Sequence, residues 1–209
     1  MTTKLACAFI AVAACAGLRA GSITEDISAT LYGCSQCSSP QNILPGTVLT
    51  DIFTPKLQLT LGPGSYTFTN GDTTIGDTYS AWNFQGPVST NWVWSFVVAN
   101  DSTGVVLMDD YIAGVFATQA LAAGATGIAT YDGNTLLSGT STAGFVDTLN
   151  LSSTTTLDLF VDDYYLGDNA GGAAVTVTGN GIGATAPEPS ALIPLGAALL
   201  GLACLRRRA

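Results

Sequence analysis

Oxygen-bearing side chains are concentrated in one short stretch of the chain, between residues 162 and 169. This stretch supplies three carboxylates and one amide oxygen, from Asp162, Asp163, Asp168 and Asn169. Calcium prefers hard oxygen ligands and accepts several of them from a flexible loop. These residues are therefore the candidate ligands of a calcium ion, the one cofactor that the sequence suggests. A solvated acidic turn that binds nothing is the simpler interpretation, and it stays open.

The order of residues around this stretch resembles a known calcium loop. A strand, Asp162-Asp163, Asp168-Asn169, Gly171-Gly172 and a second strand follow one another over about twenty residues, as in galactose-binding bacterial lectin-like β-sandwiches. In that family the bound calcium coordinates sugar hydroxyls directly. The resemblance implies that Asp162, Asp168 and Asn169 are ligands, with Asp163 either a fourth ligand or exposed.

Histidine is absent from all 209 residues, which excludes several kinds of enzyme. Ser-His-Asp and Cys-His triads, histidine general bases and His-liganded zinc or haem sites all need this residue. Paired carboxylates could still serve a glycosidase, but that mechanism needs two carboxyls facing each other across a cleft. Spacing in sequence does not show such a separation. We therefore assign no catalytic residue and expect a protein that is not an enzyme, with a secreted hydrolase as the third-ranked function.

Cysteine usage predicts a disulfide. Cys7, Cys15 and Cys204 lie in apolar terminal segments, which leaves Cys34 and Cys37 as the pair in the middle of the chain. In an oxidising compartment this pair forms a short-range disulfide. A redox centre is the alternative, although a loop-like Ser-Ser-Pro-Gln-Asn sequence follows where a redox motif would start a helix.

The charge distribution narrows the range of partners. Between residues 21 and 186 the chain carries fourteen acidic residues and one basic residue, Lys56, a formal charge of −13. Nucleic acid is excluded as a partner, because binding phosphates needs clustered Lys and Arg. Cations and neutral sugars are not repelled by such a surface. Lys56 itself is expected to pair with an Asp at the surface, with a covalent crosslink to an Asn as the alternative.

The N-terminus has the layout of a secretory signal peptide over residues 1–20. Lys4 precedes an apolar run from Leu5 to Gly17, and small residues follow it. We expect cleavage after Ala20, with Gly17 as an alternative. The sequence before Cys15 also fits a lipobox, which would instead make Cys15 a lipidated N-terminus.

The C-terminus combines three features. Pro187-Glu188-Pro189 comes first, an uncharged segment over 191–205 follows, and Arg206, Arg207 and Arg208 end it. A helix of that segment reaches about 22 Å, which is short of the roughly 30 Å hydrocarbon core of a bilayer. The arginines would stay on the cytoplasmic side, so the preceding domain would face away from the cytoplasm.

These three features resemble the PEP-CTERM sorting signal over residues 187–209. Proteins with this signal occur in Gram-negative bacteria that make exopolysaccharide. The resemblance implies recognition through Pro187, Glu188 and Pro189, transient membrane insertion through the helix 191–205, arrest by Arg206 to Arg208, and cleavage by an exosortase. An ordinary tail anchor behind a proline-rich linker is the alternative.

Alternating apolar and polar residues predict a mainly β domain over 21–178, followed by a linker over 179–186. We expect one hairpin from the runs 57–61 and 66–69, and a second from 92–98 and 105–108. Three further strands are expected over 145–151, 157–161 and 174–178, and the segment 116–126 is the one candidate for a short helix in this domain. This pattern predicts an antiparallel, jelly-roll-like β-sandwich between a signal helix and a short hydrophobic C-terminal helix. The tryptophans Trp82, Trp92 and Trp94 are expected in its core, with a sugar-stacking platform as the alternative.

Together these features predict an exported protein, tethered to the inner membrane before processing and then located at the cell surface or in the extracellular matrix. Its expected partners are the secretion machinery and an exosortase, with exopolysaccharide as a further candidate. We expect a structural or adhesive role without catalysis. The alternative is a calcium-dependent carbohydrate-binding module that uses the loop from Asp162 to Asn169.

Overall fold

A computed structural model describes residues 20–182 except 38–42, 72–78, 113, 133–134 and 142–143; for 126–143 it describes only the backbone. All described elements belong to one compact unit, Ala20–Gly183. The predicted linker beyond Ile182 and the sorting signal over 187–209 lie outside the described residues, as does the predicted signal peptide up to Arg19. Ala20, the predicted cleavage position, is the first residue of β1 (Ala20–Ser28).

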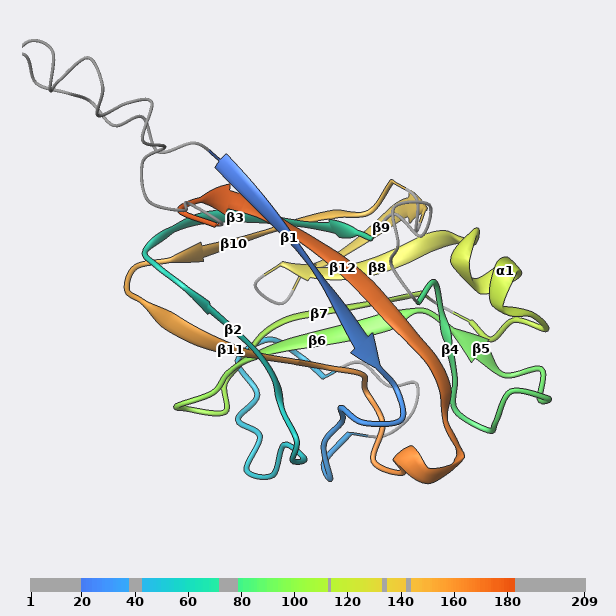
Figure 1. Cartoon of the computed structure of the whole chain (residues 1–209). Helices are drawn as coiled ribbons and strands as arrows, with labels where there is room; N and C mark the ends of the chain where they lie inside the picture. The colour runs from blue at the N-terminus through green and yellow to red at the C-terminus, as the bar shows by residue number, and fades with distance from the viewer. Residues whose placement is uncertain are drawn as a thin grey trace, which may run out of the picture. The chain divides into compact units, whose positions relative to one another are not determined.

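The described residues are mainly β-strand and form two antiparallel sheets, as the alternation of apolar and polar residues predicts (Figure 1). In the first sheet the long strand β12 is central: it pairs with β1 on one side and with β3 and β4 on the other. β10 and β5 complete this sheet at its ends. Its strands are β1 (Ala20–Ser28), β3 (Gly64–Asn70), β4 (Trp82–Asn83), β5 (Trp92–Val93), β10 (Val146–Leu151) and β12 (Ala170–Asn180).

The second sheet has the strand order β2-β11-β6-β7-β8-β9. The short helix α1 (Gln119–Ala123) precedes β8, within the predicted segment 116–126, and the side chain of Thr118 caps its N-terminus. The strands of this sheet are β2 (Leu57–Leu61), β6 (Ser95–Asn100), β7 (Val106–Ile112), β8 (Thr126–Asp132), β9 (Thr135–Ser141) and β11 (Thr155–Phe160).

One hydrophobic core contains side chains from both sheets. Phe68 of β3 stacks on Phe96 of β6 with ring centroids 6.5 Å apart, and Phe145 packs edge-on against Phe96 at 5.6 Å. Of the three tryptophans predicted in the core, Trp92 is only half-buried, whereas Trp82 and Trp94 are fully buried as predicted. The ring N–H groups of Trp82 and Trp94 donate to side-chain oxygens of the fold, which satisfies the polar atom that each ring carries inside.

The predicted hairpin from residues 57–61 and 66–69 is wrong. Both runs are strands, but β2 pairs with β11 in one sheet and β3 pairs with β10 and β12 in the other. The Gly62-Pro63 corner therefore carries the chain from one sheet to the other, and the hydroxyl of Tyr66 braces it by donating to the Gly62 carbonyl at 2.9 Å. The physical reason is that Leu59 and Leu61 of β2 and Tyr66 and Phe68 of β3 are buried in one core that lies between the two sheets, so the two runs belong to opposite layers.

The second predicted hairpin is confirmed in outline. β6 and β7 pair directly, and the turn closes with the Gly104 N–H donating to the Asn100 carbonyl at 2.8 Å. Gly104 has a positive φ of 68° and approaches Leu49 closely, so a side chain there would be strained and would collide. The strand β12 extends to Asn180, so the predicted linker over 179–186 begins two residues too early.

The long connection between β1 and β2 covers the outer face of the second sheet. Within it, Cys34, Cys37, Ile43 and Leu49 are buried against Val97 and other residues of β6, β7 and β11. This second, smaller cluster is separate from the core between the sheets. It fixes the described parts of the connection, residues 29–37 and 43–56, on the sheet.

Candidate functional site

The predicted calcium ligands lie on the connection between β11 and β12, as the sequence suggests, but they differ widely in exposure. Asp162 and Asp163 are 1% and 2% exposed, whereas Asp168 is exposed in a short 3-10 helix, Leu166–Asp168. The Asp163 carboxylate accepts the Tyr165 N–H at 3.1 Å, and thereby closes a local turn. Asn169 is buried, and its amide nitrogen donates to the Ala29 carbonyl at 2.9 Å.

The structure therefore does not gather these four side chains around one point. Among the described residues, no three Asp, Glu, His or Cys side chains come close enough to hold a metal ion. The Asn169 side-chain oxygen is buried without a hydrogen-bond partner in this part of the chain, so one predicted ligand has an oxygen to offer. Calcium binding by the loop stays a prediction.

Asp109 of β7 forms a second acidic site, at a pair of carboxylates, Asp109-Asp110, that is a weaker candidate than the loop in the sequence. It is fully buried on the outer face of the second sheet, beneath the long connection, and one of its oxygens accepts the Ile43 N–H at 2.6 Å. Its other oxygen has no hydrogen-bond partner among the described residues. Burial, followed by the negative charge of Asp162, raises the pKa of Asp109 well above its usual value, and the Ile43 hydrogen bond only partly opposes this. The sequence indicates this burial, because Asp109 directly follows the apolar run from Val105 to Met108.

Lys56 occupies a compact polar network at the start of β2. Its ammonium group donates to Asp158 at 2.8 Å and to Asp101 at 2.6 Å, and Gln58 donates to the other oxygen of Asp158 at 2.9 Å. The Lys56 side chain is 25% exposed and that of Asp158 only 1%. The hydrogen bonds to Asp101 and Asp158 raise the pKa of Lys56, which keeps the amine protonated. The predicted pairing with an Asp is confirmed, although one partner is buried rather than at the surface.

The predicted disulfide between Cys34 and Cys37 is present, with Cα atoms 5.2 Å apart. Backbone hydrogen bonds tie the bridged segment to two neighbours. Cys34 donates to the Asp163 carbonyl at 3.1 Å, and Phe53 donates to the Gly33 carbonyl at 2.9 Å. A side chain at Gly33 would collide with the Asp163 carbonyl oxygen, so glycine permits this close approach.

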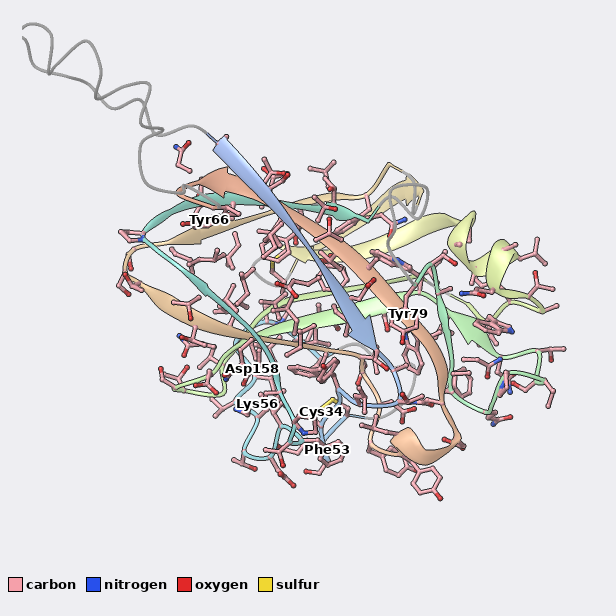
Figure 2. The ribbon with its side chains drawn as sticks, viewed as in Figure 1. Cys34, Phe53, Lys56, Tyr66, Tyr79 and Asp158 are labelled. Carbon is pink, nitrogen blue, oxygen red and sulfur yellow. A yellow bond between two sulfur atoms is a disulfide. The ribbon has the colours of Figure 1, made fainter. Side chains whose placement is uncertain are left out.

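Two hollows lie side by side along the segment 49–56. The larger, about 460 Å³, is lined by Leu31, Phe53 and Leu166 together with polar groups that include Asp51. The smaller, about 300 Å³, is lined by Thr50, Ser102 and other polar residues. Asp51 and Ile52 line both hollows, so the two are neighbours that share part of their wall. Phe53, Cys34 and Lys56 are labelled at this end of the domain in Figure 2.

Comparison with known proteins adds no assignment: no protein-family model, curated protein or solved structure matches the chain. No helix in the described part of the chain has the length and apolar character needed to cross a membrane. The predicted membrane helix over 191–205 lies outside that part.

Proposed function

We propose that this chain is an exported bacterial protein of the cell envelope or extracellular matrix, sorted by an exosortase, with a structural or adhesive role and no catalysis. The observation that carries the proposal is the order of Pro187-Glu188-Pro189, the apolar segment 191–205 and the arginines 206–208 at the C-terminus. Each part alone is common, whereas the three in this order and at these lengths are specific.

The domain that precedes this signal supports the proposal in two ways. First, the sheets share a core, which favours the jelly-roll-like β-sandwich, a rigid architecture common outside the cell. Second, Cys34 and Cys37 are bonded, and disulfides persist in oxidising compartments such as the periplasm and the cell surface.

The exposed parts of the two sheets also suit a protein in solvent outside the cell. Cross-strand threonine pairs hydrogen-bond there, Thr24 with Thr176 at 2.8 Å and Thr60 with Thr156 at 2.9 Å. Such pairs stabilise neighbouring strands without charge. These exposed hydroxyls therefore help to hold neighbouring strands together. They also offer hydrogen-bonding groups to polar partners.

The sorting step is tested by intact mass of the protein recovered from an exosortase-bearing host and from the same host lacking the exosortase. We expect a C-terminus shortened near residue 187 only in the first host. Replacing Pro187, Glu188 and Pro189 together by alanine should abolish the shortening, whereas the neighbouring Ser190→Ala should not. An unshortened chain in both hosts refutes the sorting proposal.

The alternative, a calcium-dependent carbohydrate-binding module, has one observation in its favour: the buried Asn169 oxygen that lacks a partner among the described residues. It requires the loop to rearrange, because Asp168 is exposed while Asp162 and Asp163 are buried. Thermal unfolding with and without calcium tests this alternative: a rise in Tm with calcium would favour it, and an unchanged Tm would count against it.

A further inference from the structure

The two neighbouring hollows along residues 49–56, called the groove below, form a preformed surface, not a gap between loose loops. Backbone hydrogen bonds hold the segment from Asp51 to Phe53 against the segment from Gly33 to Ser35: Ser35 donates to the Asp51 carbonyl at 3.1 Å, and Phe53 donates to Gly33 at 2.9 Å. The disulfide Cys34–Cys37 fixes the second segment. A ligand that binds here therefore has little loop ordering to bring about, which favours affinity.

The lining of the groove changes character along its length. At one end Leu31, Phe53, Pro55 and Leu166 provide apolar and aromatic surface, with Phe53 half-buried and Leu31 47% exposed. At the other end hydroxyl and carboxylate groups dominate, including those of Thr50 and Ser102. The exposed Asp51 carboxylate lines both hollows.

This combination fits the chemistry of sugars. A pyranose ring has an apolar C–H face, which packs on an aromatic or aliphatic side chain, and a rim of hydroxyls. The hydroxyls donate to carboxylates and exchange hydrogen bonds with Ser and Thr. The volumes, about 460 and 300 Å³, fall within the range of roughly 300–1,000 Å³ that ligand sites occupy.

Charge and shape define the ligand further. The one lysine of the groove, Lys56, is already bound to Asp101 and Asp158, so it does not offer a free cation to an anionic ligand. The surplus of acidic residues over 21–186 repels anions as well. Because the two hollows are neighbours on either side of Asp51 and Ile52, a linear chain of sugars can contact both, whereas a single compact molecule would occupy only one.

We propose that this groove binds a linear, uncharged polysaccharide, with Phe53 as the stacking surface for one ring and Asp51 as the acceptor for its hydroxyls. The proposal gives the adhesive role suggested above a site and a ligand class, and to that extent rests on it. It needs no calcium and does not involve the Asp162 to Asn169 loop as a metal site.

The test is native affinity electrophoresis of the full chain, in mild detergent, through gels that contain dextran, galactomannan, xyloglucan or mixed-linkage β-glucan, with alginate as the anionic probe. We expect retardation by at least one neutral polymer, unchanged by a calcium chelator, and none by alginate. No retardation by any neutral polymer, or retardation by alginate alone, overturns the proposal.

Variants locate the site. Phe53→Ala and Asp51→Ala should each weaken retardation by roughly tenfold or more, since each removes about 1.4 kcal/mol or more of contact. Phe53→Tyr keeps the ring and should retain binding. Tyr164→Ala is the matched control, because Tyr164 is 58% exposed and does not line the groove.

Each variant must also be shown to fold. Asp51 is exposed, so its substitution leaves the core intact, and fluorescence of the buried Trp82 and Trp94 reports whether each variant is folded. Equal retardation of wild type, Phe53→Ala and Asp51→Ala refutes this placement.

The outcome is independent of sorting. A chain that is shortened by the exosortase but shows no retardation would retain the sorting proposal and lose this one. A chain that is retarded but never shortened would do the reverse.

Discussion

Replacing Lys56 by methionine should destabilise the domain by about 2 kcal/mol. The substitution keeps the apolar stem and removes the ammonium group, which leaves the Asp158 carboxylate, 1% exposed, with Gln58 as its side-chain hydrogen-bond donor among the described residues. Breaking a fully buried ion pair from one side costs roughly 3–5 kcal/mol, and a hydrogen bond to a charged group is worth roughly 1.5–3 kcal/mol. The Lys56 side chain is 25% exposed, so water replaces part of the lost contact. We therefore expect a cost of about 2 kcal/mol, within the range for one hydrogen bond to a charged group.

A double-mutant cycle tests this reasoning. Asp158→Asn removes the charge and keeps an oxygen for Gln58, so we expect a cost of about 1 kcal/mol. The double variant should cost less than the sum of the singles by about 1 kcal/mol, because the stranded carboxylate is gone. Asp101→Asn is the matched control: Asp101 is 35% exposed, and its pair with Lys56 should contribute only about 0.5 kcal/mol.

The assay is urea unfolding followed by tryptophan fluorescence, since Trp82 and Trp94 are buried and become exposed on unfolding. A loss of about 2 kcal/mol also corresponds to a fall in Tm of about 4–8 °C for a domain of this size. A cost for Lys56→Met below about 0.5 kcal/mol, or costs that add without coupling, would show that the network behaves as an exposed surface pair and would refute the argument.

The remaining predictions concern the other acidic residues. Burial, and then the charge of Asp162, raise the pKa of Asp109, so its contribution to stability is fully present below the unfolded carboxyl pKa and is lost as the pH rises through the folded value. The free energy of unfolding of Asp109→Asn should therefore rise relative to that of wild type as the pH is raised from 4 to 7. Urea unfolding measures this difference, with the exposed Asp168→Asn as control. A difference that does not change with pH would contradict the prediction. Millimolar calcium should leave the Tm unchanged, because Asp162 and Asp163 are buried while Asp168 is exposed. A calcium-dependent rise in Tm that Asp168→Ala abolishes would favour the lectin alternative.

The local features of the fold were predictable because they depend on neighbouring residues. Alternation marks the runs 57–61 and 157–161 as strands, and the Asn100 to Gly104 turn connects β6 and β7 as its residue types indicate. Which strands pair with each other was not predictable in the same way. β2 and β3 are separated by two residues yet belong to different sheets, because their partners come from β10, β11 and β12, about 80 or more residues further along the chain. No pattern within residues 57–70 indicates which distant strand each of the two pairs with.

The candidate site was predictable only in part, for a similar reason. The disulfide follows from spacing and compartment, and the pairing of Lys56 with an Asp follows from its being the one basic residue among the fourteen acids of 21–186. The groove depends on three segments, around Leu31, Phe53 and Leu166, that come together only in the folded chain. Phe53, an aromatic residue in the short loop between Asp51 and Pro55, was the one hint of it in the sequence.

Several buried acidic residues of this domain serve mainly to hold the chain together. Asp158 binds Lys56 at the start of β2, Asp109 binds the Ile43 N–H, and the Asp163 carbonyl binds the bridged segment at Cys34. All three contacts fasten the same long connection to the second sheet or to the loop after β11. Because Asp158 and Asp109 are committed to this support, we expect recognition by the domain to fall to more accessible groups, such as the exposed Asp51 and the half-buried ring of Phe53 in the groove. A partner of this domain should therefore respond to changes at Asp51 and Phe53 without loss of stability, whereas changes at Asp109 or Asp158 should act on stability first.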